Sequence, residues 1–149
     1  MKSSNSAAPK LADLLSFAIY STNLAFGRAY RPILEKLGLT YTQYIAVIVL
    51  WEEGAQTVSS LGEKLFLESN TLTPILKKLE ALGYLTRERS ATDERQVIVS
   101  LTYAGHQLRE RGLDIHLIEN SNLSPIESKA VQSAVVAVRN TLIGLTRAR

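Results

Sequence analysis

The hydrophobic positions of the chain follow a helical period over most of its length and a strand period over one short stretch. Apolar residues recur every three or four positions in a series of segments before residue 83 and again after residue 102. Between these segments, two β-rich runs lie on either side of a polar turn at 90–95. The pattern predicts a mainly α-helical fold that carries one small β-hairpin.

The first two predicted helices differ in how their apolar residues are distributed. The first spans about residues 11–37, and Pro32 should either kink it or separate its last turn. The second spans 42–52 and is apolar on nearly all sides, which predicts a central position in the domain. Residues 53–56 should form a loop into the next helix.

Residues 57–83 contain two short amphipathic helical patterns joined by a polar turn. Ser60, with Glu63 three residues later, matches a capping box for the first helix. Ser69 or Asn70 can cap the second helix. A helix pair of this kind followed by a hairpin is the order of elements in a winged helix-turn-helix, a module that binds DNA.

The second helix of this pair has an apolar stripe and a polar face. The polar face carries short hydrogen-bonding side chains first and lysines afterwards: Ser69, Asn70, Thr71, Thr73, Pro74, Lys77 and Lys78. A recognition helix places its N-terminal turns in the major groove, where short polar side chains reach base edges. Pro74 costs little if it lies near the start of the helix, and Gly83 should end it. We therefore expect base contacts from Ser69, Asn70, Thr71 and Thr73, and phosphate contacts from the lysines.

The predicted hairpin is basic. Its strands and turn carry Arg87, Arg89, Asp93, Arg95 and Gln96. Positive charge along a hairpin suits phosphates or a narrow minor groove, so we expect Arg87 and Arg89 to contact phosphates. The alternative is a solvated hairpin beside an ordinary helix pair, with no ligand.

Three segments resemble the MarR family of winged-helix transcriptional regulators, and in particular its organic hydroperoxide resistance regulators (OhrR): 39–44, 72–80 and 93–102. The resemblance spans about residues 11–112. It implies a repressor of an organic-peroxide-resistance-type operon that binds a pseudo-palindromic DNA operator as a homodimer. The wing of the family has an Asp-x-Arg pattern, so that Arg95 would enter the minor groove and Asp93 would fix its direction. A solvated turn tip is the alternative for this pair.

The segments after the hairpin are helical in pattern. Thr102 can cap a helix over about 103–118. Ser124, followed by Pro125 and by Glu127, has the residues of a capping box that opens a last helix. That helix has more apolar surface than a compact DNA-binding lobe can cover, so we expect a second copy of the chain to cover it. A monomeric bundle is the alternative.

These patterns predict a single domain at 11–149 after a disordered tail at 1–10. Within it, 41–102 would be the DNA-binding lobe, and the helices in 11–40 and 103–149 would form the dimer.

In OhrR regulators one cysteine near the start of the first helix reacts with peroxide, and Ser16 occupies that position here. Either the natural protein is not a thiol sensor, or serine replaces its cysteine. The resemblance implies a pocket in which Tyr20, Tyr30 and Tyr41 hydrogen-bond this residue, with Tyr41 coming from the partner chain. Tyr30 lies fourteen residues after Ser16, about 21 Å along a helix, so only an antiparallel copy could bring the two together. The alternative is that these tyrosines are half-buried core residues.

Composition narrows the function classes. The 149 residues include no cysteine and only His106 and His116, which align poorly on one helix, so we expect no metal and no cofactor. No nucleophilic triad or phosphate loop is present, which disfavours an enzyme. The net charge of +3 permits nucleic-acid binding. Without an apolar run long enough for a membrane span or a signal peptide, a cytoplasmic location is expected.

Two other functions remain open from the sequence. A small lipophilic or aromatic ligand, rather than an organic hydroperoxide, could be the effector of the same fold. A winged helix used only for protein–protein contact is the third possibility, but the neutral and basic face of 69–78 does not favour it.

Overall fold

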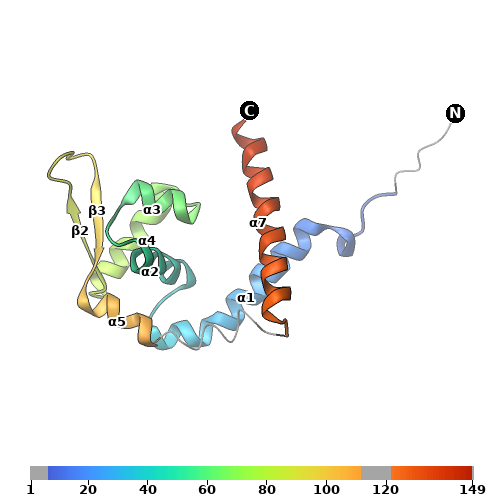
Figure 1. Ribbon diagram of the computed structural model, residues 1–149, viewed down its shortest axis with the longest axis horizontal. Helices are drawn as coiled ribbons and strands as arrows, with labels where there is room; N and C mark the ends of the chain where they lie inside the picture. Colours follow the sequence, from blue (N-terminus) through green and yellow to red (C-terminus); the bar gives the residue numbers. More distant parts are fainter. Residues whose placement is uncertain (1–6, 112–121, 149) are drawn as a thin grey trace. The chain divides into compact units, whose positions relative to one another are not determined.

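A computed structural model of the chain describes residues 7–111 and 122–148 (Figure 1). Residues 1–112 and 113–149 form two compact units, and each is described by itself. Helices dominate both units, and the first also contains a small antiparallel sheet. The predicted mainly α-helical fold with a hairpin is therefore confirmed. Residues 1–6 of the predicted disordered tail lie outside the described residues.

The first helix begins later than predicted. A single 3-10 turn, Leu11–Asp13, is followed by extended Leu14, and α1 then spans Leu15–Leu37. The helix continues through Pro32, so no last turn is separated. Pro32 has no N–H, so the only intrahelical hydrogen bond lost is the one to the carbonyl of Arg28, four residues earlier. Arg28 lies on an exposed turn of the helix, where water can bond that carbonyl. Gly38, with a φ of 71°, ends the helix in the left-handed conformation as predicted.

The second helix, α2, spans Tyr41–Glu53 and lies in the centre of the first unit, as predicted. Its cap is a reciprocal pair of Thr40 and Gln43 that was not predicted. Gln43 N donates to Thr40 Oγ1 at 3.3 Å, and Thr40 N donates to Gln43 Oε1 at 2.9 Å. The hydrogen bond to Gln43 Oε1 gives this buried polar side chain a partner for its carbonyl oxygen.

The sheet contains one strand that was not predicted. Its order is β1-β3-β2, with β1 at Gln56–Thr57, β2 at Leu85–Arg89 and β3 at Val97–Leu101. The segment predicted as a loop at 53–56 therefore enters a short strand, which pairs with the centre of β3. A two-residue strand has no periodicity of its own, so only its partner reveals it. The predicted hairpin of β2 and β3 is confirmed, and its turn extends over 90–96.

Helices α3, Val58–Leu65, and α4, Ser69–Ala81, form the predicted pair, but their caps differ from the prediction. Thr57 caps α3 by accepting a hydrogen bond from Ser60 N at 3.0 Å, so the capping box at Ser60 is wrong. Glu68 is the N-cap of α4 and makes no side-chain cap bond. Ser69 and Asn70 are therefore the first two residues of the helix rather than its cap. The cap of α3 lies three residues before the predicted one because β1 leads directly into α3, and the cap of α4 lies one residue before Ser69.

Gly83 ends α4 as predicted. Its φ is 82°, its N–H bonds Glu80 O at 2.9 Å, and Tyr84 N bonds Leu79 O at 3.0 Å, which is a Schellman motif.

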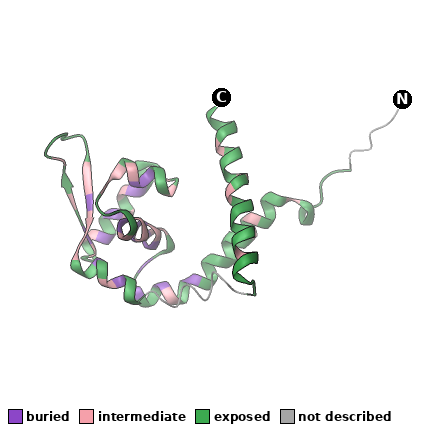
Figure 2. Cartoon of the chain, viewed as in Figure 1, coloured by how far each residue is buried: buried purple, intermediate pink, exposed green. Residues whose placement is uncertain are grey.

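The core of the first unit lies between α2, α3, α4 and the sheet (Figure 2). Its fully buried side chains come from all of these elements: Val47, Leu50, Leu61, Leu72, Leu76, Leu79, Leu85 and Val99. Because three of them are spaced along α4, that helix is fixed on one side and presents the opposite side to solvent.

Helix α5 spans Tyr103–Arg111, and Thr102 caps it as predicted, since Thr102 Oγ1 accepts from Gly105 N at 3.2 Å. The rest of the predicted helix, with His116, lies outside the described residues. In the second unit, α7 spans Pro125–Arg147 and begins with the predicted capping box of Ser124 and Glu127.

Among the described residues, no single helix combines the length and apolarity needed to cross a bilayer. Taken together, α1 and α2 meet that test, but they are bent by 69° at the break between them.

Candidate nucleic-acid interface

The exposed side of α4 carries the polar residues predicted to contact DNA. Asn70, Thr71, Pro74, Lys77 and Lys78 are all exposed, opposite the buried leucines of the same helix. Neither lysine forms an ion pair with any described residue. Both ammonium groups are thus available to a partner.

Pro74 and Thr73 differ from what the sequence suggested, Pro74 in its position along the helix and Thr73 in its hydrogen bonding. Pro74 is the sixth residue of the helix, so it lies beyond the first turn and leaves the Asn70 carbonyl without its helical donor. The expectation that this proline costs little because it lies near the helix start is therefore wrong. The Thr73 hydroxyl donates to Ser69 O at 2.7 Å, which leaves only its lone pairs for a ligand.

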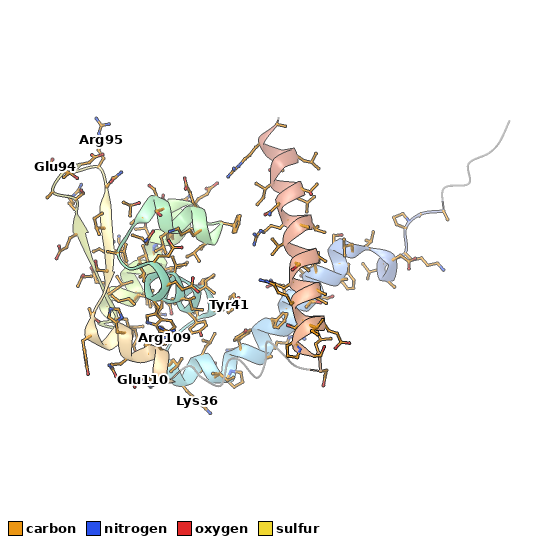
Figure 3. All side chains as sticks on the ribbon, viewed as in Figure 1. Lys36, Tyr41, Glu94, Arg95, Arg109 and Glu110 are labelled. Carbon is orange, nitrogen blue, oxygen red and sulfur yellow. The ribbon has the colours of Figure 1, made fainter. Side chains whose placement is uncertain are left out.

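Arg95 extends from the tip of the hairpin, away from the lobe (Figure 3). Its guanidinium has no partner among the described residues, whereas its backbone N–H donates to Asp93 Oδ1 at 3.1 Å. Asp93 therefore acts on the backbone of the turn and not on the guanidinium itself. Nearby, Arg89 Nη1 donates to Glu94 O at 2.9 Å, which closes the turn from its other side.

Arg87 is held inside the lobe rather than presented to solvent. Its Nη2 lies 3.1 Å from Glu80 Oε1, and its backbone N–H donates to Glu80 Oε2 at 3.0 Å. The Arg87 side chain is only 23% exposed. Since Glu80 is on α4 and Arg87 is on β2, this pair joins the recognition helix to the wing. Arg87 is therefore not the free phosphate contact that the sequence predicts, and Glu80 is a residue of this site that no sequence pattern indicates. Seven residues separate the two across the Gly83 turn, and no helical spacing signals their pairing.

The same pairing lowers the pKa of Glu80 from its usual value of 4.5, because the Arg87 side chain donates a hydrogen bond to the carboxylate and adds its charge. A lowered carboxyl pKa stabilises the fold above the unfolded-state pKa. That contribution is lost as the pH falls through the folded-state pKa.

We expect Glu80→Gln to lower the free energy of unfolding at pH 7 and to make stability fall less steeply on acidification below about pH 5. Urea unfolding at pH 7 and at pH 4 measures both effects. Glu88→Gln is the control, because Glu88 is exposed on β2 beside Arg87 and forms no ion pair with a described residue. Equal behaviour of the two variants would show that the Glu80–Arg87 pair contributes nothing.

A cavity of about 220 Å³ lies between α3, α4 and the hairpin. Its polar lining comes from all three elements and from the Thr57 cap of α3: Thr57, Ser59, Ser69, Thr73, Arg87, Arg95 and Gln96. Ser69 and Thr73 thus lie on the side of α4 that faces the wing, apart from Asn70, Thr71 and the lysines. Ser59 was not among the predicted site residues, because a lone serine at the start of a helix carries no distinctive pattern.

The structure brings together only part of the tyrosine set predicted around Ser16. Ser16 and Tyr20 lie exposed in the first turns of α1. Tyr30 is 3% exposed near the other end of the same continuous helix. Its ring centroid lies 5.2 Å from that of Tyr41 in the same chain. Within one chain, therefore, Tyr30 packs on Tyr41, whereas Ser16 and Tyr20 lie near the other end of α1.

The described residues contain no group of three histidine, aspartate or glutamate side chains that could hold a metal ion. His106 is exposed on α5.

Comparisons with known proteins agree with this architecture. Residues 28–111 match the family described as transcriptional regulator SarA/Rot. The chain is 42% identical over 135 residues to the organic hydroperoxide resistance transcriptional regulator of Bacillus subtilis, covering 89% of this chain and 92% of that protein.

Solved structures of similar fold are also transcriptional regulators. The structure of reduced AbfR bound to DNA is 40% identical, with a TM-score of 0.74 over 89% of this chain and 94% of that one. A cysteine-to-serine mutant of MarR from E. coli complexed with operator DNA is 25% identical, with a TM-score of 0.74 over 83% and 92% of the two chains. The chain therefore belongs to the MarR family of winged-helix transcriptional regulators, in the group of the organic hydroperoxide resistance regulators.

Proposed function

We propose that this regulator binds a pseudo-palindromic DNA operator as a homodimer and represses an organic-peroxide-resistance-type operon. The observation that carries the proposal is the pairing, in one lobe, of an exposed polar helix face on α4 with an unpaired arginine at the tip of the adjacent hairpin. Regulators of this family with which the chain shares its fold have been solved on DNA. A protein that binds chromosomal DNA works in the cytoplasm, where we place it.

The contacts divide by chemistry. Asn70 and Thr71, at the exposed start of α4, are short side chains that suit base edges, and Pro74 suits a thymine methyl group. Lys77 and Lys78, one turn later, suit phosphates. Arg95 suits the minor groove, with Asp93 and Gln96 holding the turn that presents it.

We expect Arg95→Ala to weaken operator binding by about tenfold or more at low salt and to reduce the slope of log Kd against log salt by about two, one for each protomer. The guanidinium is unpaired within the described residues, so its loss should not unfold the lobe. Binding isotherms at several salt concentrations measure both quantities. An unchanged affinity and slope would remove Arg95 from the interface; Arg109→Ala, on α5, is the control for a simple loss of charge.

A second copy of the chain is the partner that we propose for the apolar surfaces of α1 and α7. Large apolar side chains are exposed along both helices: Leu15, Phe17, Tyr20, Leu24, Phe26, Ile126, Val131, Val135, Leu142 and Leu145. Figure 2 shows the N-terminal half of α1 and most of α7 as exposed. Soluble monomers rarely expose apolar patches of this extent. An antiparallel second copy would also bring its Tyr30 and Tyr41 pair toward Ser16.

Thiol oxidation cannot control this chain as it stands. AbfR has been solved as reduced, overoxidised and disulfide-formed protein, whereas the present sequence contains no cysteine. A serine hydroxyl does not form a sulfenic acid. We therefore propose that Ser16, with Tyr20, Tyr30 and Tyr41, keeps the protein in a DNA-binding state that ignores organic hydroperoxides.

The test is a titration of the full chain into labelled DNA from upstream of its own gene, with and without an organic hydroperoxide. Tight, competitor-resistant binding that is equal in both arms is expected. Binding no tighter than to unrelated DNA would refute the operator proposal. Loss of binding on adding hydroperoxide would show that a residue other than a cysteine senses oxidation.

A further inference from the structure

Pro74 leaves one backbone acceptor of the recognition helix without its usual partner. Pro74 has no N–H and lies inside α4, four residues after Asn70. The carbonyl of Asn70 therefore lacks the donor that pairs it in a regular helix. The hydroxyl next to this position does not replace that donor, because Thr73 Oγ1 donates to Ser69 O at 2.7 Å. Among the described residues, no side chain donates to Asn70 O.

This acceptor lies on the side of α4 that faces away from the core. Successive residues of a helix are about 100° apart, so Asn70 and Pro74 each lie about 160° around the axis from Leu72. Leu72 is fully buried, whereas Asn70 and Pro74 are exposed. Helix carbonyls point along the axis toward the residue four positions later, which places Asn70 O between these two exposed residues. Thr71 and Thr73 lie only about 100° from Leu72, so Asn70 O is nearer to the centre of the exposed side than they are.

The residues around the acceptor allow another molecule to approach it. A proline ring crowds the carbonyl four residues earlier, which bends a helix and turns that carbonyl outward. The exposed side chains beside Asn70 O, those of Asn70, Thr71 and Pro74, are short. The long side chains of the same face, Lys77 and Lys78, follow only in the next turn. The backbone at Asn70 can therefore come closer to the floor of a DNA groove than the backbone beneath the lysines.

A carbonyl oxygen can only accept hydrogen bonds, and this limits which bases it can read. In the major groove, adenine presents its N6 amino group and cytosine its N4 amino group as donors, whereas guanine and thymine present O6 and O4 as acceptors. A carbonyl in this groove therefore binds adenine or cytosine and is repelled by guanine or thymine. The neighbouring side chains have other preferences, since an asparagine amide pairs with adenine through N6 and N7, and an apolar ring contacts the thymine methyl group.

We propose that the main-chain carbonyl of Asn70 accepts a hydrogen bond from the amino group of an adenine or a cytosine at one position in each operator half-site. Pro74 is then a specificity-determining residue that acts through the backbone, because its missing N–H leaves this carbonyl available to DNA. The inference rests on the proposed function and adds to it a base-reading group that is not a side chain.

The test uses Pro74→Ala, which restores the N–H four residues after Asn70 and so pairs the carbonyl within the helix. This variant should fold and have a higher thermal unfolding midpoint than the wild type, because proline is unfavourable inside a helix. Asn70→Ala is the matched control, since it removes the neighbouring side chain and keeps the carbonyl. The ligand is a duplex selected from random DNA with the full wild-type chain, and every base pair of it is then substituted in turn.

We expect one position in each half-site where adenine and cytosine support equal wild-type binding and guanine and thymine weaken it by about tenfold. Placing unsubstituted purine, which lacks only the amino group of adenine, at that position in both half-sites should also weaken wild-type binding by about tenfold. Asn70→Ala should bind more weakly overall but show the same ratio between the adenine and purine duplexes. Pro74→Ala should bind these two duplexes equally. Because each ratio is taken within one variant, loss of the proline ring contact does not affect it.

Three results would each overturn this reading of the Asn70 carbonyl. The first is that no position of the duplex accepts adenine and cytosine alike. The second is that Pro74→Ala keeps the wild-type ratio, and the third is that Asn70→Ala loses it, which would assign the amino group to the asparagine side chain. None of them affects the proposed operator binding, which the wild-type chain tests by itself. If no selected duplex binds the wild-type chain, the proposed function fails instead.

Discussion

Gly105→Ala should destabilise the first unit by about 3 kcal/mol, the largest effect on stability that we expect from one added methyl group. A Cβ at this position would lie 2.1 Å from Tyr84 O and 2.9 Å from Leu101 Cδ2. The first contact is with backbone, so no side-chain rotation can relieve it. To avoid the clash, α5 must move away from the start of β2.

That movement would break hydrogen bonds as well. Gly105 O accepts from Trp51 Nε1 at 3.0 Å, and Tyr84 O accepts from Thr102 N at 3.0 Å. Because Trp51 is the only tryptophan in the sequence, its fluorescence reports on this junction directly. Urea unfolding followed at Trp51 should show a lower midpoint, and thermal unfolding a loss of roughly 10 °C.

Gly27→Ala is the control for this prediction. Gly27 lies inside α1, and a Cβ there meets nothing within 4 Å in the chain. Alanine in a helix interior is favoured over glycine by roughly 0.5–1 kcal/mol, so this variant should be as stable as the wild type or more stable. If Gly105→Ala behaved like Gly27→Ala, the close approach of α5 to β2 would be wrong.

The elements that the sequence predicted well are those whose pattern is local. The apolar stripe of α4 sets its buried side, and the polar remainder of that helix follows without knowledge of the rest of the fold. The alternation around the hairpin and the capping box at Ser124 are equally local, and the structure places both where they were predicted.

The predictions that were wrong concern residues whose structure depends on a partner far away in the sequence. β1 exists because β3 offers it hydrogen bonds, and once Thr57 is in that strand it becomes the cap of α3 in place of Ser60. Arg87 looks like any other basic residue of the wing until Glu80 is found beside it. The Arg87 guanidinium is paired with Glu80 and links β2 to α4. Arg95, by contrast, forms no ion pair with any described residue.

The residues around Ser16 also show that contacts between distant residues are not visible in the sequence. Helical spacing correctly indicated that Tyr30 is too far along α1 to reach Ser16 in one chain. It did not indicate that Tyr30 would pack on Tyr41 in the same chain. Ser16 and Tyr20 are both exposed near the start of α1. A cysteine can therefore replace Ser16 without disturbing the buried core.

Ser16→Cys should convert a hydroperoxide-insensitive DNA-binding protein into one that releases DNA on oxidation. Ser16 is the second residue of α1, and Leu14, its N-cap, makes no side-chain cap bond. The free first-turn amides would stabilise a thiolate there and lower the cysteine pKa below its usual value of about 8.5. The thiolate would attack a peroxide oxygen, releasing the alcohol and leaving a sulfenic acid.

We expect at least a tenfold loss of operator affinity when Ser16→Cys is treated with an organic hydroperoxide, recovery on adding a thiol reductant, and no change in the wild-type chain. Ser21→Cys is the matched control. It places a thiol in the interior of the same helix, where the Ser21 hydroxyl bonds Phe17 O at 2.8 Å and the surrounding amides are paired. Its pKa should stay near the usual value and its affinity should not respond. If Ser16→Cys is oxidised while its affinity for DNA is unchanged, this end of α1 is not coupled to the DNA-binding lobe, and the serine has not disconnected a switch.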